Sequence, residues 1–155
     1  MNSKSIYDYA NEKDSNKHIS FSDVFNTLLN GIDCVVCLES AADLLGYSNG
    51  GFRAKIKIYT EKDYDLPYLE CHKVEDITKI PHEENNGIKV MTIEKTIIDL
   101  LENEDSDDQV ILETFANYYF ENNNFSKIDV PSKLIDKFNY YKEEGIKYYN
   151  SNWFM

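Results

Sequence analysis

Cysteine and histidine are the residues of this chain that could bind a transition metal. Cys34 and Cys37 have the spacing of one half of a tetrahedral zinc site. Cys71 and His72 are adjacent, and adjacent side chains of a strand point to opposite faces, so both could hardly bind one ion. Two valines separate the first pair, as in a core strand. We therefore interpret the cysteines as small buried residues and expect no metal and no cofactor.

Residue patterns that are typical of catalysis are missing from the sequence. The histidines His18, His72 and His82 share no spacing pattern, and we expect them at the surface. The sequence contains no nucleophile elbow, no phosphate-binding glycine loop and no H-E-x-x-H motif. The odd number of cysteines, three, does not fit a secreted disulfide framework. We therefore predict that the protein is not an enzyme and has no catalytic residue.

An acidic segment is the most distinctive charged feature. Seven acids and no base lie between Asp99 and Glu113. The segment lacks the ligand order of a calcium-binding loop and the lysine of a nuclease site. Two interpretations stay open: a solvated loop, or a negative surface that meets a basic groove on a partner protein. The acids of such a surface would be Glu102, Glu104, Asp105, Asp107 and Asp108.

The C-terminal region is unusually rich in aromatic residues. Tyrosine and tryptophan are enriched at protein interaction sites, so these side chains either pack on the domain or form a partner-binding patch. A stacking platform for nucleic-acid bases is disfavoured because no arginine lies nearby. The set begins with Tyr140 and Tyr141, and the candidate contact residues within it are Tyr148, Tyr149, Trp153 and Phe154.

The net charge restricts what the chain can bind. The sequence has 16 Lys+Arg and 28 Asp+Glu, a net charge of −12, whereas nucleic acid and anionic membranes require a basic face. The one basic strand face that we predict consists of Arg53, Lys55 and Lys57, the candidate nucleic-acid contact. The predicted helix 21–30 has no Lys or Arg, so we do not expect it to read DNA. No apolar run approaches the roughly 18 residues of a membrane span, and we expect a cytoplasmic protein.

Apolar spacing predicts the elements that position these residues. Strands in the middle of the chain and helices at both ends predict an α+β fold, with a small central β-sheet, a short N-terminal helical unit and a C-terminal helical segment. We expect a single domain, 1–155, in which 1–31 is a candidate small helical unit and 32–155 the α+β body. Ser20 and Thr92 are predicted to cap the helices that follow them, and Gly145 is predicted to end the last helix. The helices are predicted at 21–30, 39–45, 93–101, 110–120 and 131–144, and strands at 34–37, 54–59, 68–74 and 88–91.

Two of these segments together resemble a known family. Residues 38–46, Leu-Glu-Ser-Ala-Ala-Asp-Leu-Leu-Gly, resemble the helix L-x-S-A-L-x-x-x-G-L of the AbiEi antitoxins. Residues 90–101, Val-Met-Thr-Ile-Glu-Lys-Thr-Ile-Ile-Asp-Leu-Leu, resemble that family's strand-to-helix segment, V-T-x-x-E-R-T-L-x-D-L-L. Lys95 replaces the usual arginine. The resemblance covers residues 20–120.

The resemblance implies a bacterial, non-enzymatic antitoxin-like protein from a phage-defence or mobile-element locus. Members of the family join a winged-helix DNA-binding unit to a C-terminal domain, repress their own operon and neutralise a nucleotidyltransferase-like toxin. The segment before the first motif is too short for a full winged helix, so the likeness is to the C-terminal domain. We expect a regulatory protein whose partner is a toxin or nuclease with a basic surface. The alternative is a phage-borne acidic inhibitor that mimics nucleic acid and blocks a host nuclease or a CRISPR effector.

Overall fold

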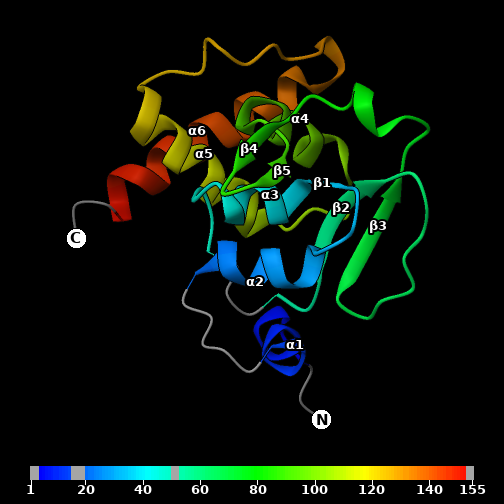
Figure 1. Ribbon diagram of the computed structural model, residues 1–155. Helices are drawn as coiled ribbons and strands as arrows, with labels where there is room; N and C mark the ends of the chain where they lie inside the picture. The colour runs from blue at the N-terminus through cyan, green and yellow to red at the C-terminus, as the bar shows by residue number, and fades with distance from the viewer. Residues whose placement is uncertain (1–3, 15–19, 50–52, 153–155) are drawn as a thin grey trace.

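The computed structural model describes residues 4–14, 20–49 and 53–152. A five-stranded mixed sheet lies at its centre (Figure 1). The strands are β1 (Val35–Val36), β2 (Ile56–Thr60), β3 (Leu69–Lys73), β4 (Glu83–Asn85) and β5 (Ile88–Val90). Their order is β3-β2-β1-β5-β4. The pairs β1–β5 and β2–β3 are parallel, while β1–β2 and β4–β5 are antiparallel.

Helices flank the sheet on both sides. They are α1 (Ile6–Lys13), α2 (Phe21–Leu29), α3 (Leu38–Leu44), α4 (Ile93–Glu102), α5 (Asp108–Asn122) and α6 (Ile135–Asn152), with 3-10 turns η1 (Ile77–Lys79) and η2 (Ser132–Leu134). In Figure 1, α1 and α2 lie on one side of the sheet, and α4, α5 and α6 lie on the other. The helix α3 packs on α4 and β2. This arrangement confirms the predicted α+β fold.

Capping and turn residues set the ends of several elements. The Ser20 side chain accepts a first-turn N–H of α2, and Thr92 does the same for α4, as the sequence predicts. Asn86 and Gly87, with φ angles of 52° and 83°, join β4 to β5. Positive φ at both central residues is what a tight hairpin turn requires, and Asn-Gly supplies it at the lowest steric cost.

The N-terminal segment contributes a helix that shares the core of the body. Ser5 and Asp8 form a capping box at the start of α1. The Ile6 N–H donates a hydrogen bond of 2.8 Å to the Arg53 carbonyl. Ile6 is buried in the same apolar cluster as Phe138 of α6. The described part of segment 1–31 therefore packs against the body of the protein.

The prediction that Gly145 ends the last helix is wrong. The helix α6 continues through this residue to Asn152. A Cβ atom at Gly145 would lie 2.7 Å from Cβ of Phe115 and 3.2 Å from the backbone nitrogen of Ala116. Glycine is needed here because α6 crosses α5 too closely for a side chain. The tyrosines Tyr148 and Tyr149 consequently belong to the last turns of a packed helix and not to a tail.

The helices α5 and α6 pack side by side and run in the same direction. The Tyr141 hydroxyl donates to Asp108 near the start of α5. Further along both helices, the ring of Tyr149 lies 5.4 Å from that of Tyr119. The segment 123–134 passes back over this pair so that α6 begins near the start of α5 (Figure 1).

Among the described residues, every helix is too short or too polar to cross a membrane.

Candidate functional site

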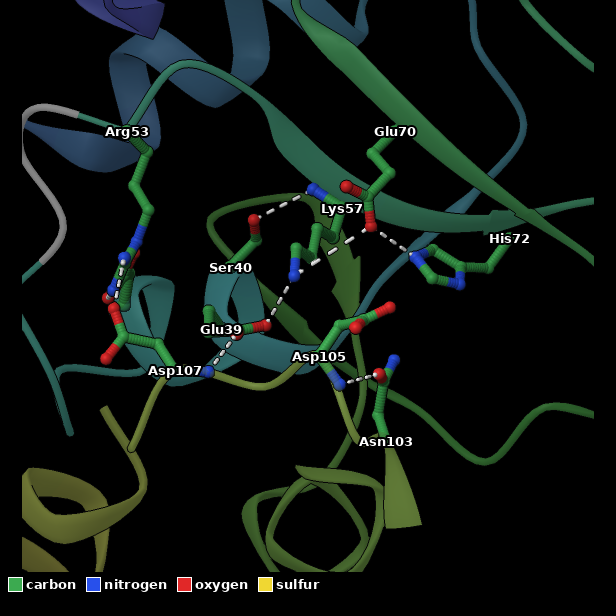
Figure 2. Close-up of polar contacts among 10 residues, drawn as sticks. Glu39, Ser40, Arg53, Lys57, Glu70, His72, Asn103, Asp105 and Asp107 are labelled. Atoms are coloured by element: carbon green, nitrogen blue, oxygen red, sulfur yellow. Dashed lines mark hydrogen bonds and ion pairs between the residues drawn. The ribbon is translucent and has the colours of Figure 1, made fainter. Parts of the chain in front are cut away.

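The helix α3 is buried along its whole length, although it contains two acids. Glu39, Ser40 and Asp43 are 3%, 2% and 3% exposed. Buried carboxylates are costly unless each has a cation or several hydrogen bonds. The partners of these three side chains come from β2, from the segment before it and from the loop before α5 (Figure 2).

Glu39 joins the sheet to the acidic loop. One carboxylate oxygen, Oε1, lies 2.9 Å from Nζ of Lys57 on β2. The other, Oε2, accepts the N–H of Asp107 at 2.8 Å. The Lys57 N–H donates to Oγ of Ser40 at 2.8 Å, so α3 fixes both ends of this lysine. Both oxygens of Glu39 are therefore satisfied within the fold (Figure 2).

Asp43 makes a second buried pair one turn further along α3. Its Oδ2 accepts from Nε of Arg53 at 2.9 Å, and the Ser48 hydroxyl donates to its other oxygen. Arg53 also lies 3.7 Å from the carboxylate of Asp107. The guanidinium thus links α3 to the same loop residue whose N–H Glu39 accepts.

The three residues predicted as a basic nucleic-acid contact do not share one open face. The Arg53 and Lys57 side chains are 24% and 20% exposed and point toward the carboxylates of α3. Lys55 is exposed and lies just before β2. Two of the three cations are therefore neutralised internally, which leaves a single exposed lysine from the predicted strip.

The predicted acids form the loop between α4 and α5. Asp107 is the N-cap of α5 and accepts the N–H of Gln109 at 2.9 Å. Asn103 caps the preceding turn by accepting the N–H of Asp105 at 2.9 Å (Figure 2). The side chains that the sequence singled out are exposed in this loop and at the two helix ends: Glu102, Glu104, Asp105, Asp107 and Asp108.

The predicted aromatic residues divide between two sides of α6. The Tyr148 hydroxyl accepts a hydrogen bond of 3.3 Å from Nε2 of Gln109, beside the acidic loop. Tyr149 packs on the other side, where its ring lies 5.8 Å from that of Phe120. Trp153 and Phe154 lie outside the described residues.

A groove between α5 and α6 brings the two predicted surfaces together. Its volume is about 370 Å³, and it contains both Asp108 of the acidic set and Tyr148 of the aromatic set. The sequence prediction ended the last helix at Gly145, so it did not place Lys147, Tyr148 and Ser151 on the same helix as Tyr140 and Tyr141. If α6 is read as one continuous helix, its lining residues recur every three or four positions and therefore lie on one face. The lining residues are Asp108, Leu112, Tyr140, Tyr141, Glu144, Lys147, Tyr148 and Ser151.

A smaller polar pocket lies where β2 and β3 meet α4. The Tyr59 hydroxyl donates to Asp99 at 3.2 Å, and Nε2 of His72 lies 2.6 Å from Glu70. Burial raises the pKa of Asp99, although Lys95 at 3.3 Å opposes that shift. No group of histidine, cysteine and acidic residues in the described part of the chain is arranged to hold a metal ion.

The first two cysteines are buried, as predicted. Cys34 and Cys37 are 7% and 0% exposed, and burial raises the pKa of the Cys34 thiol to about 12. Burial also raises the pKa of Cys37 well above its usual value. Cys71 is only half-buried, which corrects the prediction for that residue, and all three thiols are free. Raised pKa values make Cys34 and Cys37 poor nucleophiles.

The two segments that carry the AbiEi resemblance are neighbours in space. Val36, just before α3, pairs in parallel with Val90, just before α4. The Met91 N–H donates to the Val36 carbonyl at 2.9 Å, and the two helices that follow these strands pack together. The chain matches no protein-family model and no characterised protein sequence.

Proposed function

We propose that the protein is a non-enzymatic, AbiEi-like regulatory protein that acts by binding a basic protein partner. The observation that carries the proposal is the groove between α5 and α6, in which Asp108 and Tyr148 meet. Tyrosine supplies contact area at protein interfaces, and carboxylates nearby select for positive charge. The proposal places the protein in the bacterial cytoplasm, at a phage-defence or mobile-element locus.

The internal ion pairs support this choice over nucleic-acid binding. Arg53 forms an ion pair with Asp43, and Lys57 forms one with Glu39. The acidic loop, in contrast, presents Glu104 and Asp105 to solvent. A surface of this sign repels nucleic acid and steers a basic protein toward itself.

Co-expression with a nucleotidyltransferase-like toxin tests the proposal. Wild-type protein should restore growth of cells in which the toxin is induced, and the variant Glu104→Lys/Asp105→Lys should restore it poorly. This variant spares the capping residue Asp107. The matched control is Glu83→Lys/Glu84→Lys, which reverses two exposed acids of β4 and should rescue like wild type. Equal rescue by the two double variants would refute the proposal. Failure of all three proteins, wild type included, to restore growth would also refute it.

A second candidate function uses the same acidic loop. Successive exposed carboxylates at Glu104 and Asp105 favour a nucleic-acid mimic that occupies the basic channel of a nuclease. A mimic should inhibit DNA cleavage in a purified assay, and excess catalytically inert DNA should displace it. An antitoxin should leave cleavage unchanged, so the two functions give opposite results.

A further inference from the structure

The groove between α5 and α6 combines ring faces and carboxylates within one concave surface. Tyr140 is 58% exposed, and its ring lies 5.1 Å from that of Tyr141 at an interplanar angle of 83°. Asp108 contributes a carboxylate from α5, and Glu144 contributes one from α6. A ligand seated here would meet a flat aromatic surface and an anion at the same time.

We propose that this groove binds an arginine side chain of the protein partner. A guanidinium is planar, so it can stack on a phenol ring while its N–H groups donate to a carboxylate. A lysine ammonium is a compact, strongly hydrated charge and cannot satisfy both surfaces equally. The inference rests on the proposed function, because it names the chemistry that the same surface recognises.

Charge complementarity selects this occupant over an acidic or neutral one. The groove lining contains two carboxylates, Asp108 and Glu144, and one ammonium, Lys147. Lys147 lies 3.2 Å from Glu144 and 3.5 Å from Glu143, and its side chain is 65% exposed. Exposed ion pairs of this kind contribute little, so an incoming guanidinium can take over Glu144. The neighbouring acidic loop adds further negative charge.

The packing of α5 against α6 prepares the groove before binding. The Tyr141 hydroxyl already donates to Asp108, and Gln109 donates to the Tyr148 hydroxyl. The close crossing at Gly145 fixes the distance between the helices. Groups that are held in place before binding lose little conformational entropy when the ligand arrives.

Fluorescence anisotropy with synthetic peptides tests the inference on the full chain. The probes are three labelled amphipathic helical peptides that differ only in their charged residue, which is arginine, lysine or glutamate. Wild-type protein should bind the arginine peptide about fivefold or more tightly than the lysine peptide, because only a planar guanidinium stacks on the ring and donates to a carboxylate at once. The glutamate peptide should not bind.

Variants in the groove separate the stacking from simple charge attraction. Tyr140→Ala removes an exposed ring and should abolish the preference for arginine, whereas Tyr140→Phe should keep it. Glu144→Gln should weaken binding of both cationic peptides. Glu84→Gln, an exposed acid on β4, is the matched control and should change neither affinity.

Equal affinity of the arginine and lysine peptides for wild type would overturn the inference, as would an unchanged preference in Tyr140→Ala. The peptide result is independent of toxin neutralisation. Peptide binding with the expected selectivity but without growth rescue would refute the proposed function and leave the groove assignment standing. Growth rescue without arginine selectivity would refute the groove assignment and leave the proposed function standing.

Discussion

The charges around α3 and the charges of the loop before α5 are arranged in opposite ways. Around α3, carboxylates and cations meet at 2.9 Å in pairs that are mostly hidden from solvent. In the loop before α5, Glu104 and Asp105 are exposed and have no ion pair among the described residues. Two bases and two acids therefore neutralise one another inside, so the net charge of −12 is carried by the other residues, the exposed acids of this loop among them.

This difference separates charge that maintains the fold from charge that is available to a partner. A buried ion pair is costly to break because removal of one partner leaves the other without compensation. Exposed acids cost little to change. Substitutions in the two regions should therefore produce opposite patterns of stability and binding.

The largest loss of stability should come from the buried ion pairs around α3. Glu39→Ala removes the partner of Lys57 and the acceptor of the Asp107 N–H. We expect a loss of about 3 kcal/mol in the free energy of unfolding, as for other broken buried pairs. Urea denaturation followed by circular dichroism measures it. A loss below about 1 kcal/mol would show that water replaces Glu39, and the contrast between the regions would disappear.

Gly145→Ala tests the scaffold that forms the groove. At an exposed helical position this change stabilises by about 1 kcal/mol. At Gly145 the new Cβ would lie 2.7 Å from Phe115, so we expect a net loss of about 1–3 kcal/mol. The change in urea midpoint gives the sign directly. Asn139→Ala, at an exposed position of the same helix, is the control and should stay within about 0.5 kcal/mol of wild type. A stabilised Gly145→Ala protein would contradict the close crossing.

Asp99 lies on α4, the helix that packs on α3, and its burial makes stability depend on pH. Burial raises its pKa in the folded state, so the folded protein binds this proton more tightly than the unfolded chain. The contribution of Asp99 to stability is therefore greatest below its unfolded pKa and is lost as pH rises through the folded pKa.

Asp99→Asn should remove this pH dependence and still accept a hydrogen bond from Tyr59. Relative to wild type, the variant should become more stable as the pH is raised from 3 toward 7, and the difference should then level off. Unfolding free energies measured at several pH values test this. A difference that does not vary with pH would show that Asp99 is not desolvated.

The smallest effect on stability should come from the exposed acids of the loop before α5. Glu104→Lys/Asp105→Lys should change the free energy of unfolding by no more than about 0.5 kcal/mol. The same variant should lose binding to a basic partner, and wild-type binding should weaken as salt increases. Loss of more than about 2 kcal/mol of stability would assign these acids to the fold and not to recognition.

The sequence was sufficient where local chemistry decides the structure. The caps at Ser20 and Thr92 and the alternation of apolar residues in 54–59 predicted a helix, another helix and a strand that the structure contains. These signals lie within a few residues of one another, and their physical cause is equally local. The α+β arrangement followed from the order of such elements.

The sequence was insufficient where a residue acts through a distant partner. Lys57 looked like an exposed strand residue. Its partner Glu39 lies 18 positions away, and no local pattern predicts that pairing. Gly145 looked like a helix stop, because a glycine that permits close packing and one that ends a helix are identical in sequence. That error also hid the continuous face of α6, which carries Lys147, Tyr148 and Ser151 into the groove.

The two buried ion pairs restrict how this sequence can diverge. An uncompensated change at either position of the pair Glu39 and Lys57, or of the pair Asp43 and Arg53, leaves a buried charge alone. Related sequences should therefore show correlated replacement at positions 39 and 57 and at positions 43 and 53. The acids of the loop should drift independently, unless a partner diverges with them. Covariation at these two pairs would identify distant relatives even where overall identity is low.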